Sequence, residues 1–153
     1  MTGRAWRLVR ESYRESALSG EGAAKAGGRW NPRGVRVIYA SGSRALAALE
    51  TLVHLNRSAP YRWLVFPIAF DPAWVEVIPP AKLPPDWRES PASNSTQGMG
   101  DRWLRERTAP ILQVPSVIIP EEPNYLLNPV HPDFARIRMG APDLFVFDQG
   151  LAR

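Results

Sequence analysis

The sequence predicts an α+β domain in which a twisted, mixed or largely antiparallel sheet carries few helices. Short runs rich in β-branched and aromatic residues recur along the chain, whereas only residues 43–56 place apolar residues at helical spacing over several turns. No internal repeat is present. With 153 residues the chain is long enough for one domain with its own hydrophobic core, so we expect a single domain over residues 1–153.

The N-terminal part of the chain is predicted to contribute two strands joined by a long loop. Residues 5–10 alternate apolar and basic side chains, which is typical of a strand with one solvated face. Residues 11–28 are rich in Ser, Gly and Ala and have little periodicity, so we expect an ordered loop there. Turn-forming residues occupy positions 31–34, and the β-branched and aromatic content of residues 35–40 predicts the second strand.

A helix and two further strands are expected next. Ser43 predicts the N-cap of a helix that ends near Asn56 and buries an apolar stripe along one side. Residues 62–70 have strand composition, and Pro67 within them indicates an edge position or a bulge, because proline cannot donate to a sheet ladder. Residues 74–78 predict a short return strand.

The rest of the chain is predicted to be rich in loops. In order, we expect a proline-rich connector over residues 79–85, a polar loop over 89–100, a short helix over 102–107 capped by Asp101, strand pieces over 111–114 and 117–119, a turn-rich segment over 124–132, one helical turn over 131–134 and a last strand over 144–148. Asn124, Asn128 and His131 lie in the turn-rich segment, where such residues most often serve turns and caps.

Composition limits the classes of partner that the protein can have. The net charge is +4, and nearly all of the positive residues are arginine, which binds phosphate groups bidentately. The arginines are dispersed along the chain, whereas a nucleic-acid-binding protein gathers its cations into a patch, so direct nucleic-acid binding is disfavoured.

Other functional classes are excluded by residues that the sequence lacks. Without cysteine there is no disulfide, thiol nucleophile or thiolate zinc site, and two histidines argue against a metal centre. No apolar run approaches the ~20 residues that span a bilayer, and the N-terminus has no signal-peptide core. We therefore expect a cytoplasmic protein without a metal or a membrane partner.

The glycine turn and the strand that follows it contain two candidate ligand-binding residues. Arg29 follows Gly27 and Gly28, which let a ligand approach the backbone closely while the guanidinium binds a phosphate or carboxylate. The alternative is a tight turn with a surface arginine on Trp30. Tyr39 lies on the following strand, either as a core aromatic or as a ring that stacks on a base or a pyridine.

Two further candidates are a carboxylate and a hydroxyl. Glu50 borders the apolar stripe of the predicted helix, where a half-buried carboxylate suits electrostatic catalysis; a simple pair with His54 one turn later is the alternative. Ser116 interrupts an apolar strand and needs a hydrogen-bond partner. It either bonds neighbouring backbone, holds a ligand hydroxyl or orients Glu50.

Taken in order, these segments resemble the RES domain, a family named for an arginine, a glutamate and a serine. The resemblance extends over nearly the whole chain and depends on the joint order and spacing of the segments. They are Gly28-Arg29-Trp30-Asn31, Val37-Ile38-Tyr39-Ala40-Ser41, the helix from Ala45 to Glu50, Val114-Pro115-Ser116, the segment from Asn124 to Pro129, and Phe145-Val146-Phe147-Asp148.

The resemblance implies a fold like that of ADP-ribosyltransferases and an enzyme that attacks NAD as its substrate, with no resident cofactor. Arg29, Glu50 and Ser116 match the name-giving positions, and Tyr39 matches the aromatic residue of the pocket. Family members are typically toxins of bacterial toxin–antitoxin pairs. The expected partner is an Xre-like antitoxin with a helix-turn-helix region, through which alone the toxin would meet nucleic acid, and a homodimer within that complex is one candidate assembly.

On this resemblance Glu50 would stabilise the positive charge that develops on the ribose as neutral nicotinamide leaves. Arg29 would bind the pyrophosphate, Tyr39 would stack on or wall the nicotinamide, and Ser116 would bond the ribose or fix Glu50. The acceptor is water, phosphate or a protein side chain. With water or phosphate as the acceptor, the resemblance implies an NAD glycohydrolase or phosphorylase. Two alternatives stay open: a mono-ADP-ribosyltransferase that modifies a host protein, and a basic nucleic-acid-binding module without NAD chemistry.

Overall fold

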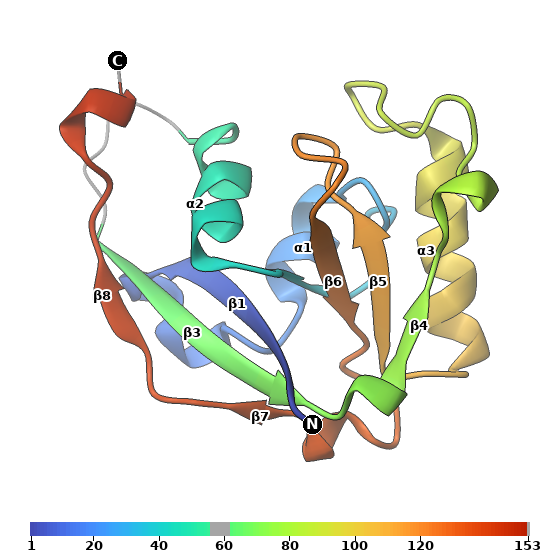
Figure 1. Cartoon of the computed structure of the whole chain (residues 1–153), viewed down its shortest axis with the longest axis horizontal. Coiled ribbons are helices and arrows are strands. Elements are labelled where there is room, and N and C mark those ends of the chain that lie inside the picture. The colour runs from blue at the N-terminus through green and yellow to red at the C-terminus, as the bar shows by residue number, and fades with distance from the viewer. Residues whose placement is uncertain (56–61, 153) are drawn as a thin grey trace.

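The computed structural model of the protein describes residues 1–55 and 62–152, and within them eight strands form one curled, mixed sheet (Figure 1). The spatial order is β4-β5-β6-β2-β1-β3-β7, and β8 also pairs with β3. The strands are β1 (Gly3–Arg10), β2 (Ile38–Ser41), β3 (Trp63–Phe70), β4 (Val75–Val77), β5 (Ile111–Pro115), β6 (Pro123–Leu127), β7 (Arg138–Met139) and β8 (Asp143–Phe145). Neighbours run antiparallel except for the parallel pair β4 and β5. The predicted α+β class with a mixed sheet is confirmed.

Few helices accompany this sheet. The α-helices are α1 (Glu21–Ala26), α2 (Arg44–Leu52) and α3 (Asn94–Glu106), and the 3-10 turns are η1 (Glu11–Ser16), η2 (Pro72–Trp74), η3 (Pro80–Lys82), η4 (Phe134–Arg136) and η5 (Gln149–Ala152). Within the described part of the chain, every helix is too short or too polar to span a bilayer.

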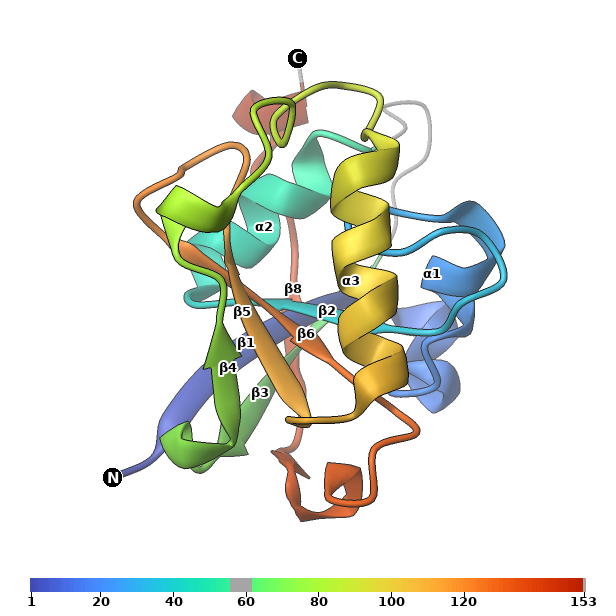
Figure 2. The same cartoon turned by 90° about the vertical axis from the view of Figure 1, so that its right-hand side faces the viewer.

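Both longer helices cover the same face of the sheet. Figure 2 shows α3 alongside β5 and β6, where Trp103 and Leu104 pack on Leu126. Helix α2 contacts β1 and β2, and its Glu50 bonds Asn124 of β6. Because Asn124 and Leu126 are two residues apart on one strand, their side chains point to the same face. On this face α2 therefore lies over β1 and β2, and α3 lies next to it over β5 and β6.

The buried hydrophobic residues form three clusters, and alternating strand residues separate the two larger ones on opposite faces of the sheet; the third comprises Val9, Ala17, Leu64 and Phe66. Neighbouring residues of one strand, such as Leu126 and Leu127, go to different cores. The core beneath α3 comprises Trp30, Val37, Trp103, Leu104, Leu112, Val114 and Leu126. The core on the opposite face comprises Ala5, Ile38, Ala40, Ile68, Phe70, Ile111, Leu127 and Ile137.

A buried arginine ties the first two strands together. The Nε atom of Arg7 donates to the carbonyl of Ala17 (2.6 Å), and its Nη1 atom donates to the carbonyl of Tyr39 (2.8 Å). Burial lowers the pKa of Arg7 to about 10, so the guanidinium still carries its charge at neutral pH. Arg7 thereby fixes the backbone of a strand whose side chains reach the candidate site.

Several expected elements are confirmed. β1, β3 and β4 lie where strands were predicted, β8 lies at the start of the predicted last strand, and Ser43 caps α2 by accepting the N–H of Leu46 at 3.0 Å. Asn56, near which the end of this helix was predicted, lies outside the described residues. Pro67 is not in an edge strand, but it lies between the segments of β3 that pair with β7 and β8, where only its carbonyl bonds outward, to Gly140 N.

Two predictions of loop are wrong because local sequence hides a helix. The expected loop over 11–28 contains η1 and α1. The expected loop over 89–100 contains the first half of α3, which begins at Asn94 and not at Arg102. Gly98 and Gly100 weaken the helical signal of that half. Burial of Thr96, Gly100 and Trp103 against the rest of the molecule supplies the missing stability.

The strand predictions around Ser116 are shifted by tertiary pairing. Residues 117–119 are not a strand, because the Ser116 hydroxyl binds the N–H groups of Ile118 and Ile119 and turns the chain. The next strand, β6, occupies the start of the segment predicted as turns. Its composition is unremarkable for a strand, but it pairs with β2 on one side and β5 on the other. The strand expected over residues 35–40 corresponds to β2, which begins only at Ile38.

Candidate active site

A carboxylate in the last turn of α2 is held by two side chains that are distant in sequence, one just after β5 and one on β6. The Ser116 hydroxyl donates to Oε1 of Glu50 at 2.6 Å, and Nδ2 of Asn124 donates to the same oxygen at 2.9 Å. Within residues 1–55 and 62–152, Oε2 of Glu50 accepts no hydrogen bond. One oxygen thus fixes the orientation of the half-buried carboxylate, and the other stays available to a ligand.

Local sequence explains how Glu50 arrives there. The Ser43 cap sets the start of α2, and Leu46 and Ala47 are buried against the sheet. Glu50 follows them by four and three residues, which places it beside their buried side of the helix. Ser116 is fully buried at the end of β5, where the two N–H groups that its Oγ accepts (3.1 Å each) fix the hydroxyl.

Tyr39 is anchored to the glycine turn by its hydroxyl. It donates to Oδ1 of Asn31 at 2.6 Å and accepts the N–H of Trp30 at 3.1 Å. A Cβ at Gly28 would lie 2.8 Å from this hydroxyl, so glycine is required for the close approach. Burial raises the pKa of Tyr39 well above its ordinary value, although the bond from Trp30 and the charge of Arg29 partly offset it. The phenol is therefore neutral, and its hydroxyl connects β2 to the glycine turn.

Arg29 lies on the same turn and forms hydrogen bonds to the loop that contains Trp87 and Glu89. Its Nη1 atom donates to the carbonyls of Trp87 and Glu89, each at 2.8 Å. Burial lowers the pKa of Arg29, and the negative charge of Glu50 opposes that shift, with a further contribution from Tyr39. The Tyr39 hydroxyl bonds the residue that follows Arg29, and Tyr39 lies two residues before Ser41, which contacts Asn124 beside Glu50. Hydrogen bonds and the register of β2 and β6 thus connect the segments of Arg29, Tyr39, Glu50 and Ser116 into one neighbourhood.

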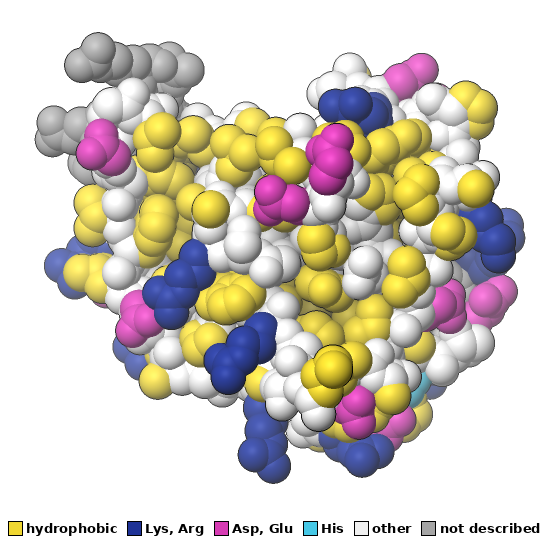
Figure 3. All heavy atoms as spheres, viewed as in Figure 1, with side chains coloured by type: hydrophobic (Ala, Val, Ile, Leu, Met, Phe, Trp, Pro, Cys, Tyr) yellow, Lys and Arg dark blue, Asp and Glu magenta, His cyan; other side chains and the backbone are white. Residues whose placement is uncertain are grey.

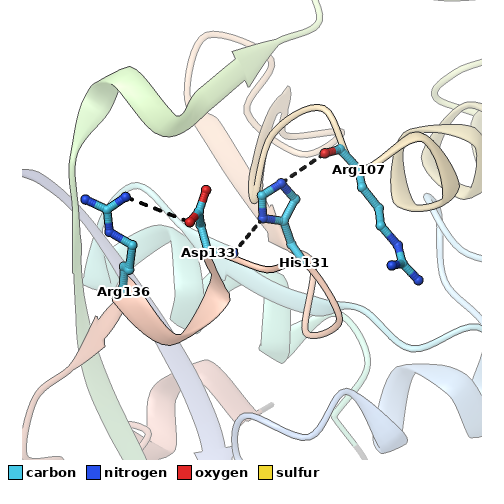
Figure 4. Close-up of polar contacts among 4 residues, drawn as sticks. All are labelled: Arg107, His131, Asp133 and Arg136. Carbon is cyan, nitrogen blue, oxygen red and sulfur yellow. Dashed lines mark hydrogen bonds and ion pairs between the residues drawn. The ribbon is translucent and has the colours of Figure 1, made fainter.

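Other candidate residues lie outside this neighbourhood. His54 is exposed at the end of α2, and Glu50 turns to Ser116 and Asn124 instead. His131 joins the end of α3 to the segment after β6: its Nδ1 accepts the Asp133 N–H (2.9 Å), and its Nε2 contacts the Arg107 carbonyl at 3.0 Å (Figure 4). Asn128 is buried and bonds backbone groups of Leu104 and Val130. The expectation that both serve turns and caps fits these contacts.

Sequence reasoning missed several residues that build the site. Asn31 was expected to form a turn. Its amide nitrogen donates to the carbonyls of Ala23 and Val35, and these bonds hold the amide in place to accept the Tyr39 hydroxyl. Gln97 of α3 donates to the Gly28 carbonyl at 2.9 Å. Both amides donate to main-chain carbonyls, and such contacts give no signal in the local sequence. Among the described residues, no three His, Asp or Glu side chains gather as a metal site.

Known proteins resemble this chain over most of its length. Residues 4–148 match the family model of the RES domain. A protein of Sphingobium sp. described as "Prs ADP-ribosylating toxin" is 42% identical, and the match covers 100% of this chain and 99% of that protein. "Toxin Res" of Yersinia enterocolitica is 37% identical, with 95% of this chain and 97% of that protein covered.

A solved structure shares the fold. The M. tuberculosis MbcT–MbcA toxin–antitoxin complex contains a chain that matches with a TM-score of 0.69, covering 95% of this chain and 85% of that chain. The two sequences are 18% identical, so the likeness concerns the course of the backbone.

Proposed function

The chain belongs to the RES domain family, and from this premise we propose that it is the toxin of a toxin–antitoxin pair and that it consumes NAD by breaking the bond between nicotinamide and ribose. Relatives at 42% and 37% identity are described as toxins, and the fold matches a chain of a toxin–antitoxin complex. The expected partner is an antitoxin protein that covers or blocks the NAD site.

One observation carries the chemical part of this proposal: Glu50 is fixed through Oε1 while Oε2 has no partner among the described residues. In the reaction the C1′–N bond breaks, its electron pair stays on the nicotinamide nitrogen, and nicotinamide leaves as a neutral molecule. Positive charge develops on the ribose, and a preoriented carboxylate stabilises it without reorganising. The acceptor then bonds to C1′ and releases its proton.

The other residues of the site take roles that match their contacts. Both N–H groups of Arg29 Nη1 are committed to the carbonyls of Trp87 and Glu89, which leaves Nε and Nη2 for the pyrophosphate. The Tyr39 ring would line the nicotinamide side, since its hydroxyl is already occupied. Ser116 is fully buried and donates to Glu50, so we assign it to orientation of the carboxylate and not to the ribose.

The acceptor distinguishes two candidate reactions. Water or phosphate as acceptor would make the protein an NAD glycohydrolase or phosphorylase. A protein acceptor would make it a mono-ADP-ribosyltransferase, which is favoured by the description of the 42% identical relative as an ADP-ribosylating toxin. A nucleic-acid-binding function receives no comparable support, because Figure 3 shows the Lys and Arg side chains of this face dispersed among apolar and acidic ones.

The test is to incubate the purified chain with NAD, with and without inorganic phosphate, and with lysate supplied with NAD labelled in the ADP-ribose part. Free ADP-ribose indicates hydrolysis, ADP-ribose phosphate indicates phosphorolysis, and a labelled protein band indicates transfer. Nicotinamide release should fall about 10²- to 10³-fold with Glu50→Gln. If the folded parent protein releases no nicotinamide under any of the three conditions, the proposed activity is wrong.

A further inference from the structure

We infer that Asn124 is a positioning residue for Glu50 and that, together with Ser41, it sets which carboxylate oxygen faces the substrate. The inference rests on the proposed function, because it assigns to Asn124 a share in the reaction that Glu50 would perform. It concerns a residue whose sequence surroundings predict only a turn.

The first step is the asymmetry of the Glu50 carboxylate. A glutamate side chain has three rotatable bonds, and a free one samples many orientations at the end of a helix. Here two donors from different segments converge on Oε1, Ser116 just after β5 at 2.6 Å and Asn124 on β6 at 2.9 Å. One donor restricts the distance of that oxygen, but two donors from different directions fix the plane of the carboxylate. Asn124 therefore determines the direction in which Oε2 points.

The second step is that the amide of Asn124 is itself fixed. Its Oδ1 accepts the hydroxyl of Ser41 at 2.7 Å, and Ser41 is almost fully buried. With the amide reversed, Oδ1 would face Oε1 of Glu50, and two acceptors would meet. The carboxylate, which only accepts, therefore selects the orientation with Nδ2 toward Glu50. The Ser41 hydroxyl, which can donate or accept, donates to the other end of the amide and holds it in place.

The third step is the rigidity of the platform. Ser41 and Asn124 lie directly opposite each other in the register of β2 and β6, and Asn124 is also paired with Val114 of β5. Both strands lie inside the sheet, with a strand on each side. Side chains on paired central strands hold position better than side chains on a loop. The chain Ser41–Asn124–Glu50–Ser116 is consequently a preoriented hydrogen-bond relay from the sheet to the reacting group.

Asparagine is chemically specific at this position because it donates without charge. Asn124→Ala removes the donor and frees the carboxylate to turn. Asn124→Asp keeps the size and shape but places a second carboxylate at hydrogen-bond distance, and two such groups cannot both be ionised comfortably. At lower pH the pair shares a proton, which restores a hydrogen bond between the two residues.

These properties define the experiment, in which steady-state NAD consumption is measured from pH 5 to pH 9. We expect Asn124→Ala to lower kcat about 10- to 100-fold with KM for NAD changed less than about twofold, since misplacing a reacting group by ~1 Å costs about that much. Asn124→Asp should be slower than Asn124→Ala at pH 8 and recover toward pH 5, a change that Asn124→Ala does not show. Gln113→Ala, which removes an amide from the opposite face of the neighbouring strand, is the control and should match the parent.

A second readout does not depend on turnover. In protein labelled with ¹³C at the glutamate carboxyl carbons, Asn124→Ala should shift the Glu50 resonance, assigned with Glu50→Gln, and Gln113→Ala should not. If the parent consumes NAD but Asn124→Ala has parental kcat, or if both variants share one pH profile, the inference is wrong. If the parent fails to consume NAD, the proposed function has failed and the catalytic share of Asn124 falls with it; an unmoved Glu50 resonance would in addition refute its positioning role.

Discussion

Ser116 Oγ lies 2.6 Å from Oε1 of Glu50 and donates to it while accepting the backbone N–H groups of Ile118 and Ile119. Its one proton and both acceptor positions are therefore used within the protein. Because the side chain is also fully buried, it has no capacity left for a ligand. In the proposed reaction the serine would therefore act only through the carboxylate that it holds.

Ser116→Ala should therefore lower kcat and leave KM for NAD nearly unchanged. It also leaves the two partly buried N–H groups of Ile118 and Ile119 without this acceptor, which costs roughly 1–3 kcal/mol in the free energy of unfolding. Urea denaturation measures the stability loss, and initial rates at several NAD concentrations separate kcat from KM. A large increase in KM with parental kcat would mean that Ser116 contacts the substrate after all.

Glu50→Gln isolates the charge of the carboxylate from its shape. The amide oxygen of glutamine can accept from Ser116 and Asn124 as Oε1 does now, so the fold should be kept. We expect NAD turnover to fall by about 10² to 10³, the loss seen when one preorganised electrostatic group is removed from an active site. Glu15→Gln is the control, because it removes the same charge from an exposed residue of η1; this variant should retain parental turnover.

Arg29→Lys tests whether the guanidinium both clasps the loop and binds phosphate. An ammonium group is a point charge without a planar fork, so it cannot donate to the Trp87 and Glu89 carbonyls and also bind a pyrophosphate in two places. We expect KM for NAD to rise about tenfold, with a smaller effect on kcat. Arg33→Lys alters an exposed arginine of the same turn and should leave both constants unchanged. An unaltered KM in Arg29→Lys would remove Arg29 from the phosphate site.

The Tyr39 phenol predicts how stability changes in alkaline solution. Burial raises its pKa in the folded state above the ordinary value of 10.0. A group with a raised folded-state pKa contributes stability that is fully present below its unfolded pKa and is lost as pH rises through the folded pKa. Tyr39→Phe should therefore be less stable than the parent by ~1 kcal/mol at pH 8, for the lost hydrogen bonds, and this difference should shrink above pH 10.

Chemical denaturation at pH 8, 10 and 11 measures this difference. Tyr13→Phe, at an exposed tyrosine, is the control, because its difference from the parent should be small at every pH. A difference between Tyr39→Phe and the parent that grows above pH 10 would contradict the assignment of a neutral, buried phenol.

The sequence could predict features that depend on neighbours along the chain. The N-cap at Ser43 and the position of Glu50 beside a buried stripe both follow from helical spacing, and the structure has both. The resemblance to a family then grouped Arg29, Tyr39, Glu50 and Ser116, which single segments could not do. Hydrogen bonds and strand pairing link the four segments in the structure, but the roles of the four residues in a reaction stay predictions.

Features that depend on register or on backbone atoms could not be predicted in the same way. Asn124 meets Glu50 across 74 positions only because β6 pairs between β2 and β5. The partners of Arg29 are main-chain carbonyls, which any residue supplies and which leave no trace in composition. Helix α3 was recognised over its second half alone, because its glycines look unfavourable until one sees what they contact.

One of those glycines supplies a direct test of how α3 supports the site. A Cβ at Gly100 would lie 1.7 Å from the carbonyl oxygen of Trp30, so alanine there must push apart the helix and the turn that carries Arg29. At Gly98, two residues earlier in the same helix, a Cβ meets nothing within 4 Å. The same substitution should therefore act in opposite directions at the two positions.

Gly98→Ala should raise the free energy of unfolding by about 0.5–1 kcal/mol, the helix propensity gained over glycine. Gly100→Ala should lower it by roughly 1–3 kcal/mol, as overpacking of a tight contact does. Because Trp30 follows Arg29 directly and its N–H bonds Tyr39, Gly100→Ala should also raise KM for NAD, whereas Gly98→Ala should not. Urea unfolding and steady-state kinetics on the two variants check both statements. Equal stability of the two variants would mean that α3 does not press on the turn of the candidate site.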